Sequence, residues 1–223
     1  MMKIILKKSS ILFFIIILIS CKKDVVIVPN IVCWGDSLTN GSGSSNDHDY
    51  PNVLSKLTNT TCFNMGVGGE TSGQIKLRML ADLTKRDQGF IIIWVGRNNY
   101  YNKLEVLNDI REMVSSLKHS RYCVLSVING DYGAYERLNG EGYQSIISIN
   151  KDLKNEYGSH YLDVRKFLVN SYRKDDINDL DDMKNDIIPS SLRTDRVHLN
   201  DLGYQIVANY IYSTYKDKFG KEF

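Results

Sequence analysis

Short apolar runs alternate with amphipathic stretches along most of this chain, and this alternation restricts the possible fold more than any other feature. The apolar runs have the length of buried strands, and the amphipathic stretches have the length of helices. Strands that alternate with helices favour a parallel sheet with both faces covered. The pattern predicts a three-layer α/β/α sandwich with a five-stranded parallel sheet. The expected strands are 25–33, 61–65, 90–95, 122–128 and 160–163, and the expected helices are 51–57, 71–85, 104–119, 143–157 and 201–219.

One segment departs from this rhythm. Residues 173–194 are acidic, rich in Asp and Asn, and show no clear period. Their composition is typical of a solvated loop. A calcium loop is the alternative, but the glycine and the terminal glutamate of an EF-hand are missing.

The N-terminus predicts export. Three lysines, Lys3, Lys7 and Lys8, precede the apolar run 11–19, which is shorter than the roughly 20 residues of a transmembrane helix. The sequence LISC, which ends at Cys21, resembles the lipobox of bacterial lipoproteins. A plain signal peptide with an incidental cysteine is the alternative.

The resemblance to bacterial lipoproteins implies three parts of the chain. Residues 1–20 are expected to be the lipoprotein signal peptide, residues 21–29 a tether, and residues 30–223 the folded domain. Lipid on Cys21 would anchor the exported protein to the cell envelope, at the outer membrane or cell surface of a Gram-negative host.

Charge and cysteine content exclude several classes of protein. Without its first 20 residues the chain has 25 basic and 26 acidic residues, which does not favour nucleic-acid binding. Cys33, Cys62 and Cys123 remain after Cys21 is set aside. Their odd number argues against a disulfide framework, and no spacing of Cys or His predicts a metal site.

Polar and glycine residues follow the expected strands, where ligands collect in parallel α/β sheets. Ser37 lies in GDSLT after the first strand, Gly69 in NMGVGGETSG after the second, and Asn98 in GRNN after the third. Asp195 and His198 lie in DRVH, just before the last helix. The glycine run does not match the dinucleotide pattern G-x-G-x-x-G, because position 71 is threonine.

This combination predicts nucleophilic catalysis. A serine hydroxyl needs a base to take its proton, and His198 can be that base for Ser37. Asp195 can hold the imidazole in the required tautomer. The backbone N–H groups of Ser37 and Gly69 and the side-chain amide of Asn98 can stabilise an oxyanion.

The four blocks, in this order, resemble the SGNH or GDSL hydrolases. The resemblance extends from about residue 31 to the C-terminus and implies a flavodoxin-like sandwich and a cofactor-free esterase mechanism. It implies Ser37 as nucleophile, Asp195 and His198 as the rest of the triad, and Gly69 and Asn98 as oxyanion donors. The third block is usually G-x-N-D, and Asn99 replaces its aspartate here, so the bracing of this loop is in question.

The loops after the third and fourth strands are expected to shape the mouth of the site. They hold tyrosines and hydrogen-bonding groups rather than the aliphatic slot that a long acyl chain needs. The residues expected there are Arg97, Tyr100, Tyr101, Tyr132 and Tyr135.

The sequence therefore predicts a serine esterase that acts on short acyl groups, chiefly acetyl, of a carbohydrate. A thioesterase, a lysophospholipase or an acyltransferase on the same scaffold is an alternative, and a non-catalytic glycan-binding lipoprotein is another.

Overall fold

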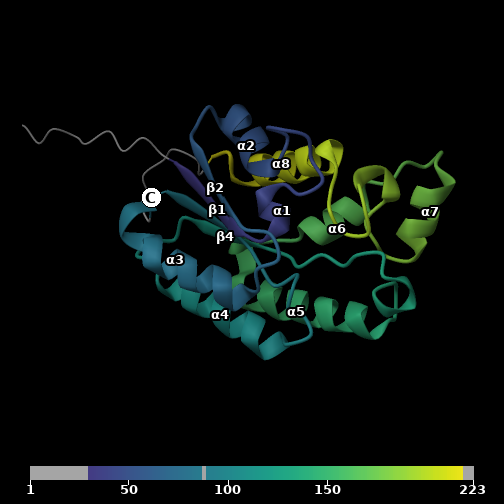
Figure 1. The fold of residues 1–223 in the computed structure, drawn as a ribbon, viewed down its shortest axis with the longest axis horizontal. Helices are drawn as coiled ribbons and strands as arrows, with labels where there is room; N and C mark the ends of the chain where they lie inside the picture. The colour runs from purple at the N-terminus through teal and green to yellow at the C-terminus, as the bar shows by residue number, and fades with distance from the viewer. Residues whose placement is uncertain (1–29, 87–88, 218–223) are drawn as a thin grey trace, which may run out of the picture.

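The computed structural model describes residues 30–86 and 89–217 (Figure 1). The expected signal peptide, the tether and Cys21 lie outside the described residues. The described chain forms one sheet with helices on both of its faces.

All five strands are parallel, in the order β2-β1-β3-β4-β5. Gly35 pairs with Gly66 of β2 on one side and with Trp94 of β3 on the other, so these three strands end at one level. The predicted three-layer fold with a five-stranded parallel sheet is confirmed. The strands are β1 (Ile31–Gly35), β2 (Cys62–Gly66), β3 (Phe90–Trp94), β4 (Tyr122–Leu125) and β5 (Tyr161–Leu162).

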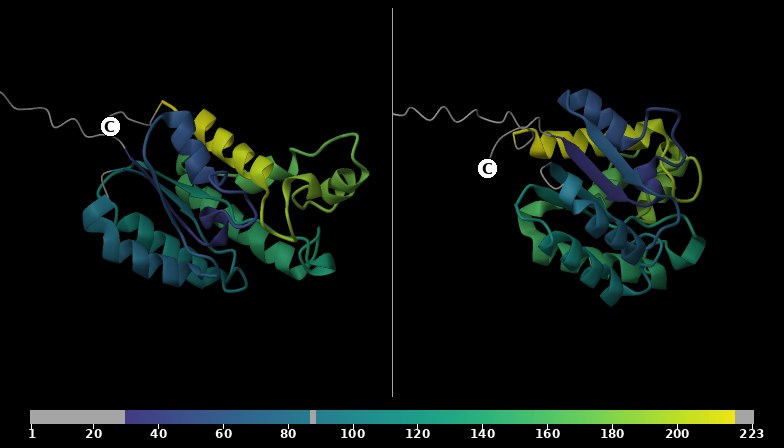
Figure 2. Two further views of the ribbon diagram at one scale, coloured as in Figure 1. Left: turned by 45° about the horizontal axis from the view of Figure 1, so that its top comes forward. Right: turned by 60° about the vertical axis from the view of Figure 1, so that its left-hand side comes forward.

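The two faces of the sheet bury two separate apolar clusters, because successive side chains of a strand point to opposite faces. In β1, Ile31 and Cys33 pack into one cluster, whereas Val32 and Trp34 pack into the other. Figure 2 shows the helices as layers on either side of the strands. The first cluster is covered by α2 (Tyr50–Thr58), α6 (Val164–Val169) and α8 (Asp201–Tyr215), and the second by α3 (Ser72–Arg86), α4 (Lys103–Ser115) and α5 (Glu141–Tyr157).

Several boundaries differ from the predicted ones by a few residues. Strand β1 continues to Gly35, β4 ends at Leu125, and α4 ends at Ser115. The predicted start of α8 is confirmed, and Asn200 caps it by accepting a hydrogen bond from the N–H of Gly203.

The prediction of a solvated loop over residues 173–194 is wrong. Helix α7 (Ile177–Lys184) and the 3₁₀ turn η3 (Ser190–Leu192) occupy much of it, and Asp179 and Asp182 are buried. Their carboxylates accept hydrogen bonds from backbone N–H groups of Arg173, Ser190 and Ser191, and such local bonding produces no apolar period. Among the described residues no cluster of His, Cys, Asp and Glu is arranged to hold a metal ion.

The three cysteines of the described residues form no disulfide with one another. Cys33 and Cys123 are buried, and Cys62 is half-buried. Burial raises the pKa of the Cys62 thiol to about 12, and it also raises the pKa of Cys33. These two thiols are therefore protonated at neutral pH and are poor nucleophiles. None of the helices in 30–86 or 89–217 has the length and apolar character required to cross a membrane.

Candidate active site

Ser37 lies on a tight connection between β1 and the short helix α1 (Ser37–Asn40). Asp36 caps this helix, because its Oδ1 accepts a hydrogen bond of 2.9 Å from the N–H of Leu38. The turn closes at Gly41, whose φ of 91° suits glycine, and the Gly41 N–H donates to the carbonyl of Ser37. The connection therefore holds Ser37 at the carboxyl end of β1.

Ser37, His198 and Asp195 form a hydrogen-bonded chain. The distance from Ser37 Oγ to His198 Nε2 is 3.0 Å, and that from His198 Nδ1 to Asp195 Oδ2 is 2.7 Å. Since an ionised carboxylate only accepts, Nδ1 of the neutral imidazole carries the proton and Nε2 accepts from the serine hydroxyl.

The Asp195 carboxylate is held in its ionised form. Its partial burial acts to raise the pKa. The hydrogen bonds from His198 Nδ1 and from the N–H groups of Val197 and His198 outweigh that effect and lower the pKa to about 2. Asp195 is therefore ionised at neutral pH.

The segment around Asp195 and His198 is a turn, not a helix. The N–H of Thr194 donates to the carbonyl of His198, and Arg193 pairs with Leu199 in an antiparallel bridge. This turn brings the side chains of Asp195 and His198 within hydrogen-bond distance of each other.

Arg193 supports this turn from the inside. Its side chain is only 6% exposed and donates to the carbonyl oxygens of Ile188, Asp195 and Arg196. An ion pair with Asp182 of α7 holds the guanidinium in place. The acidic segment therefore contributes to the position of the triad.

Each of the three expected oxyanion donors has an N–H group without an acceptor among the described residues. Among the described residues, no protein acceptor binds the N–H of Ser37 or that of Gly69. Gly69 has a φ of +80°, and a Cβ built on Gly68 would lie 3.8 Å from the Ser37 Cβ. The Asn98 amide uses one of its two N–H bonds on the carbonyl of Glu70, at 2.9 Å, and keeps the other.

The Gly69 loop is fixed by an ion pair that the sequence did not reveal. Arg78 of α3 binds both carboxylate oxygens of Glu70 and donates to the carbonyl of Met65 at the end of β2. Its guanidinium carbon also lies 5.3 Å from the centre of the Trp34 ring. Arg78 therefore ties the loop to β1 and β2.

Asn99 braces the loop after β3, where an aspartate is usual in this pattern. It is buried, its Oδ1 accepts from the N–H of Ser72 at 3.2 Å, and its Nδ2 donates to Ser72 Oγ at 3.0 Å. The Ser72 hydroxyl donates in turn to Asp109, whose other oxygen pairs with Lys76 at 2.8 Å. An amide suits position 99 because the hydroxyl of its neighbour Ser72 already donates its proton to the Asp109 carboxylate.

The structure brings together some of the residues expected at the mouth. Arg97 forms an ion pair with the buried Glu136, and Tyr100 donates to the same carboxylate. The Arg97 guanidinium carbon lies 5.0 Å from the Tyr100 ring centre and 5.3 Å from that of Tyr132.

The other two tyrosines are less tightly held. Tyr101 is 72% exposed and contacts Tyr100 edge to face, and Tyr135 lies in the 3₁₀ turn η1 (Gly133–Tyr135) with 45% of its surface exposed.

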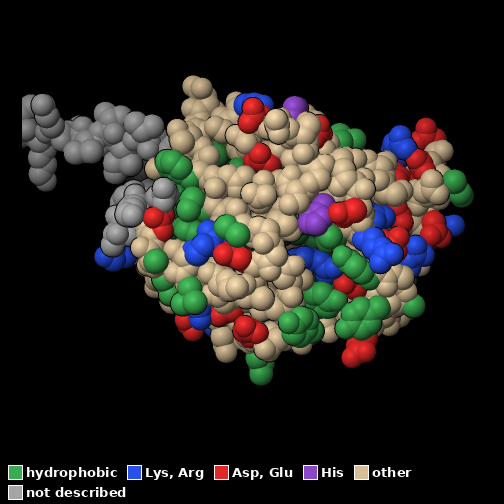
Figure 3. Space-filling model, viewed as in Figure 1, with side chains coloured by type: hydrophobic (Ala, Val, Ile, Leu, Met, Phe, Trp, Pro, Cys, Tyr) green, Lys and Arg blue, Asp and Glu red, His purple; other side chains and the backbone are tan. Residues whose placement is uncertain are grey.

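On the surface, a histidine and an acidic side chain lie together near the middle of one face (Figure 3). Basic and hydrophobic side chains border them.

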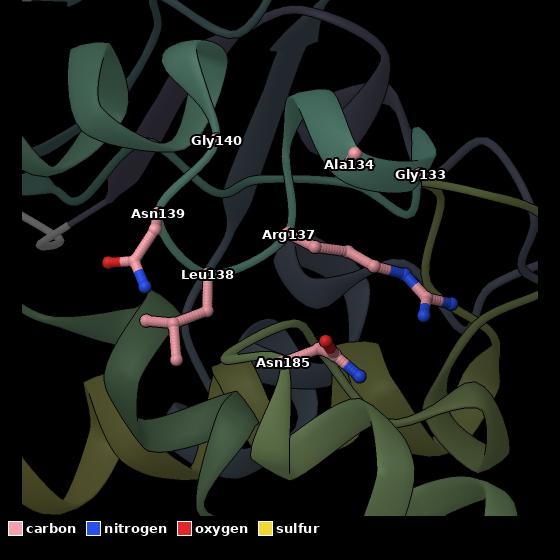
Figure 4. Close-up of a pocket in the computed structure, with 7 residues that line it drawn as sticks. All are labelled: Gly133, Ala134, Arg137, Leu138, Asn139, Gly140 and Asn185. Atoms are coloured by element: carbon pink, nitrogen blue, oxygen red, sulfur yellow. The ribbon is translucent and has the colours of Figure 1, made fainter.

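A separate cavity lies in the loop before α5. It has a volume of about 470 Å³, and none of its lining residues belongs to the triad or to the expected mouth. Figure 4 shows Leu138 pointing from this loop toward the segment that carries Asn185. The lining residues are Gly133, Ala134, Arg137, Leu138, Asn139, Gly140 and Asn185.

The arrangement has the parts of a serine hydrolase, and comparison with known families agrees. A family model described as the GDSL-like lipase/acylhydrolase family matches residues 33–206. This chain belongs to that family. A search of curated protein sequences finds no match.

Several solved structures share the fold. A G-D-S-L family lipolytic protein from Desulfitobacterium hafniense has a TM-score of 0.65 at 18% identity, covering 83% of this chain and 98% of its own. The acetyl xylan esterase AlAXEase has a TM-score of 0.63 at 17% identity, with coverages of 82% and 98%. A point mutant of Axe2, an acetyl-xylooligosaccharide esterase from Geobacillus, has a TM-score of 0.60 at 16% identity, with coverages of 83% and 93%.

Restoring the usual GDSL-family aspartate at position 99 should destabilise this protein. In Asn99→Asp, two buried carboxylates would compete for the single hydroxyl proton of Ser72, and we expect a loss of about 1–3 kcal/mol in the free energy of unfolding. Adding Asp109→Asn should recover most of that loss, because Ser72 can then donate to position 99 and Lys76 retains Glu112. Denaturant unfolding measures both variants. Equal stability of Asn99→Asp and the unmodified protein would contradict the bracing role of Asn99.

Proposed function

We propose that this GDSL-family protein is a serine esterase that hydrolyses short-chain carboxylic esters, chiefly acetyl esters of carbohydrate hydroxyls. The main support is the chain of hydrogen bonds from Ser37 through His198 to Asp195, beside N–H groups that have no acceptor in the part of the chain that the structure describes.

In the acylation step Ser37 Oγ attacks the ester carbonyl carbon while His198 Nε2 takes the hydroxyl proton. The ionised Asp195 stabilises the imidazolium that forms. The N–H groups of Ser37 and Gly69 and the free N–H of Asn98 donate to the developing oxyanion, where loss of one donor typically costs about 2.7–4 kcal/mol. His198 then passes its proton to the leaving alcohol, and an acyl-enzyme remains.

Deacylation uses the same groups in reverse. His198 takes a proton from water, the hydroxide attacks the acyl carbon, and the second oxyanion meets the same donors. Collapse of this intermediate returns the proton to Ser37 and releases the acid. His198 therefore carries the proton in both halves of the reaction.

Two observations support the proposed preference for acetyl groups on sugars: the aromatic side chains at the expected mouth of the site, and the descriptions of two similar structures. Tyr100, Tyr132 and Tyr135 offer aromatic faces with polar tips, which suit a sugar ring better than an aliphatic chain. The similar structures AlAXEase and Axe2 are described as esterases of acetylated xylan or xylooligosaccharides.

Replacement of the nucleophile tests the mechanism. Ser37→Ala should abolish hydrolysis of 4-nitrophenyl acetate with unchanged unfolding behaviour, because only the attacking oxygen is removed. A serine-directed phosphonate should modify Ser37 alone, as mass spectrometry of peptides will show. Asp195→Asn should cost less activity than His198→Ala, since orientation contributes less than the base. Turnover by Ser37→Ala at the unmodified rate would reject the assignment.

A series of acyl lengths tests the substrate class. We expect kcat/KM to fall from acetyl through butanoyl to octanoyl 4-nitrophenyl esters, because the mouth lacks an aliphatic slot that gains roughly 0.8 kcal/mol per buried methylene. A steady rise along the series would favour a lipase or thioesterase and contradict the acetyl preference.

We also propose that Cys21 carries lipid and tethers the exported domain to the cell envelope, on the support of the LISC sequence after an apolar run. Cys21→Ser should move the protein from the membrane fraction to the soluble fraction. A variant that still sediments with membranes after a carbonate wash would reject the lipid anchor.

A further inference from the structure

Arg196 differs from most other arginines of this protein. Among the described residues it has no carboxylate within ion-pair distance, and its side chain is exposed. Seven other arginines are each paired with an aspartate or glutamate: Arg78, Arg97, Arg111, Arg137, Arg165, Arg173 and Arg193. An arginine that is left unpaired beside a catalytic histidine is available to a ligand.

The protein holds Arg196 close to the site. Its carbonyl oxygen accepts a hydrogen bond of 2.7 Å from the N–H of Asp131, which joins the catalytic turn to the loop before α5. Its guanidinium carbon lies 5.8 Å from the Tyr132 ring centre, and the same ring lies 5.3 Å from the guanidinium carbon of Arg97. Tyr132 therefore contacts both Arg97, which precedes Asn98 in the sequence, and Arg196, which lies on the turn that carries His198.

The neighbouring carboxylates already have partners. Asp131 pairs with Arg137, Glu136 pairs with Arg97, and Asp195 binds His198. The positive charge of Arg196 is therefore not neutralised by the groups around it.

The place of Arg196 on the turn that carries His198 points to the alcohol part of the substrate. His198 must deliver its proton to the leaving alcohol oxygen, so the alcohol part of the substrate lies next to the imidazole. Arg196 is two residues from His198 on the same turn, whereas Gly69 and Asn98 surround the carbonyl oxygen on other loops.

We propose that Arg196, together with the ring of Tyr132, binds a carboxylate on the alcohol part of the substrate, so that the preferred substrate is an acetylated acidic sugar. This inference rests on the proposed esterase function. A guanidinium binds a carboxylate through two parallel hydrogen bonds, and one cation balances one such charge. Tyr132 is 42% exposed, so part of its ring is available to the sugar that carries that carboxylate.

A matched pair of sugars tests this inference. The acetylated methyl glycosides of galacturonate, with its carboxylate free, and of galactose differ only in a carboxylate against a hydroxymethyl group. We expect the unmodified protein to favour the galacturonate in kcat/KM by about tenfold at low salt, which corresponds to about 1.4 kcal/mol. Arg196→Gln should bring this ratio to about 1. Arg111→Gln, which removes a paired arginine on α4, should leave the ratio unchanged.

Salt gives a second readout. The preference for the galacturonate should decrease as sodium chloride rises, because exposed charges are screened over about 10 Å at 0.1 M. Equal kcat/KM for the two sugars, or a preference that survives Arg196→Gln, would overturn the role of Arg196 while the esterase function stands. Hydrolysis of 4-nitrophenyl acetate without hydrolysis of either sugar would overturn both this inference and the carbohydrate part of the proposed function.

Discussion

The parallel register of β1, β2 and β3 is the constraint on which the site depends. Because Gly35 pairs with both Gly66 and Trp94, the residues that follow these strands emerge together at one edge. The end of β2 lies close to α1, since a Cβ added to Gly66 would lie 2.1 Å from the backbone nitrogen of Asn40. Backbone pairing thus positions Ser37, Gly69 and Asn98, the proposed nucleophile and oxyanion donors.

Buried or half-buried ion pairs then fix the loops that carry each group. Arg78 and Glu70 hold the Gly69 loop, Arg97 and Glu136 hold the mouth beside Asn98, and Arg193 with Asp182 holds the triad turn. Such pairs add little net stability because desolvation opposes their attraction, but a broken pair leaves a costly buried charge. We interpret them as devices that restrict each loop to one geometry.

Much of the fold and the central residues of the site followed from the sequence, because periodicity defines strands and helices and their order places strand ends together. The sequence singled out Ser37, His198 and Asp195 in this way, and the structure places them within hydrogen-bond distance of one another. Helix α7 was missed because its aspartates bind local backbone N–H groups, which leaves no apolar period. The roles of Arg193 and Glu136 were missed because their partners lie on other elements, and the sequence alone does not show which charges meet.

The capping aspartate has a consequence for how the folded state responds to acid. Asp36 is fully buried, and its Oδ2 has no hydrogen-bond partner among the described residues. Burial raises its pKa from 3.8 to about 6, despite the hydrogen bond from the Leu38 N–H and the charge of Arg97, which act to lower it. Folding therefore takes up a proton at this group between pH 3.8 and 6, and its contribution to stability increases as the pH falls through that window. Above pH 6 the ionised carboxylate opposes folding by about 3 kcal/mol. The turn that presents the nucleophile is thus a site of stored electrostatic strain at neutral pH, which mild acid relieves.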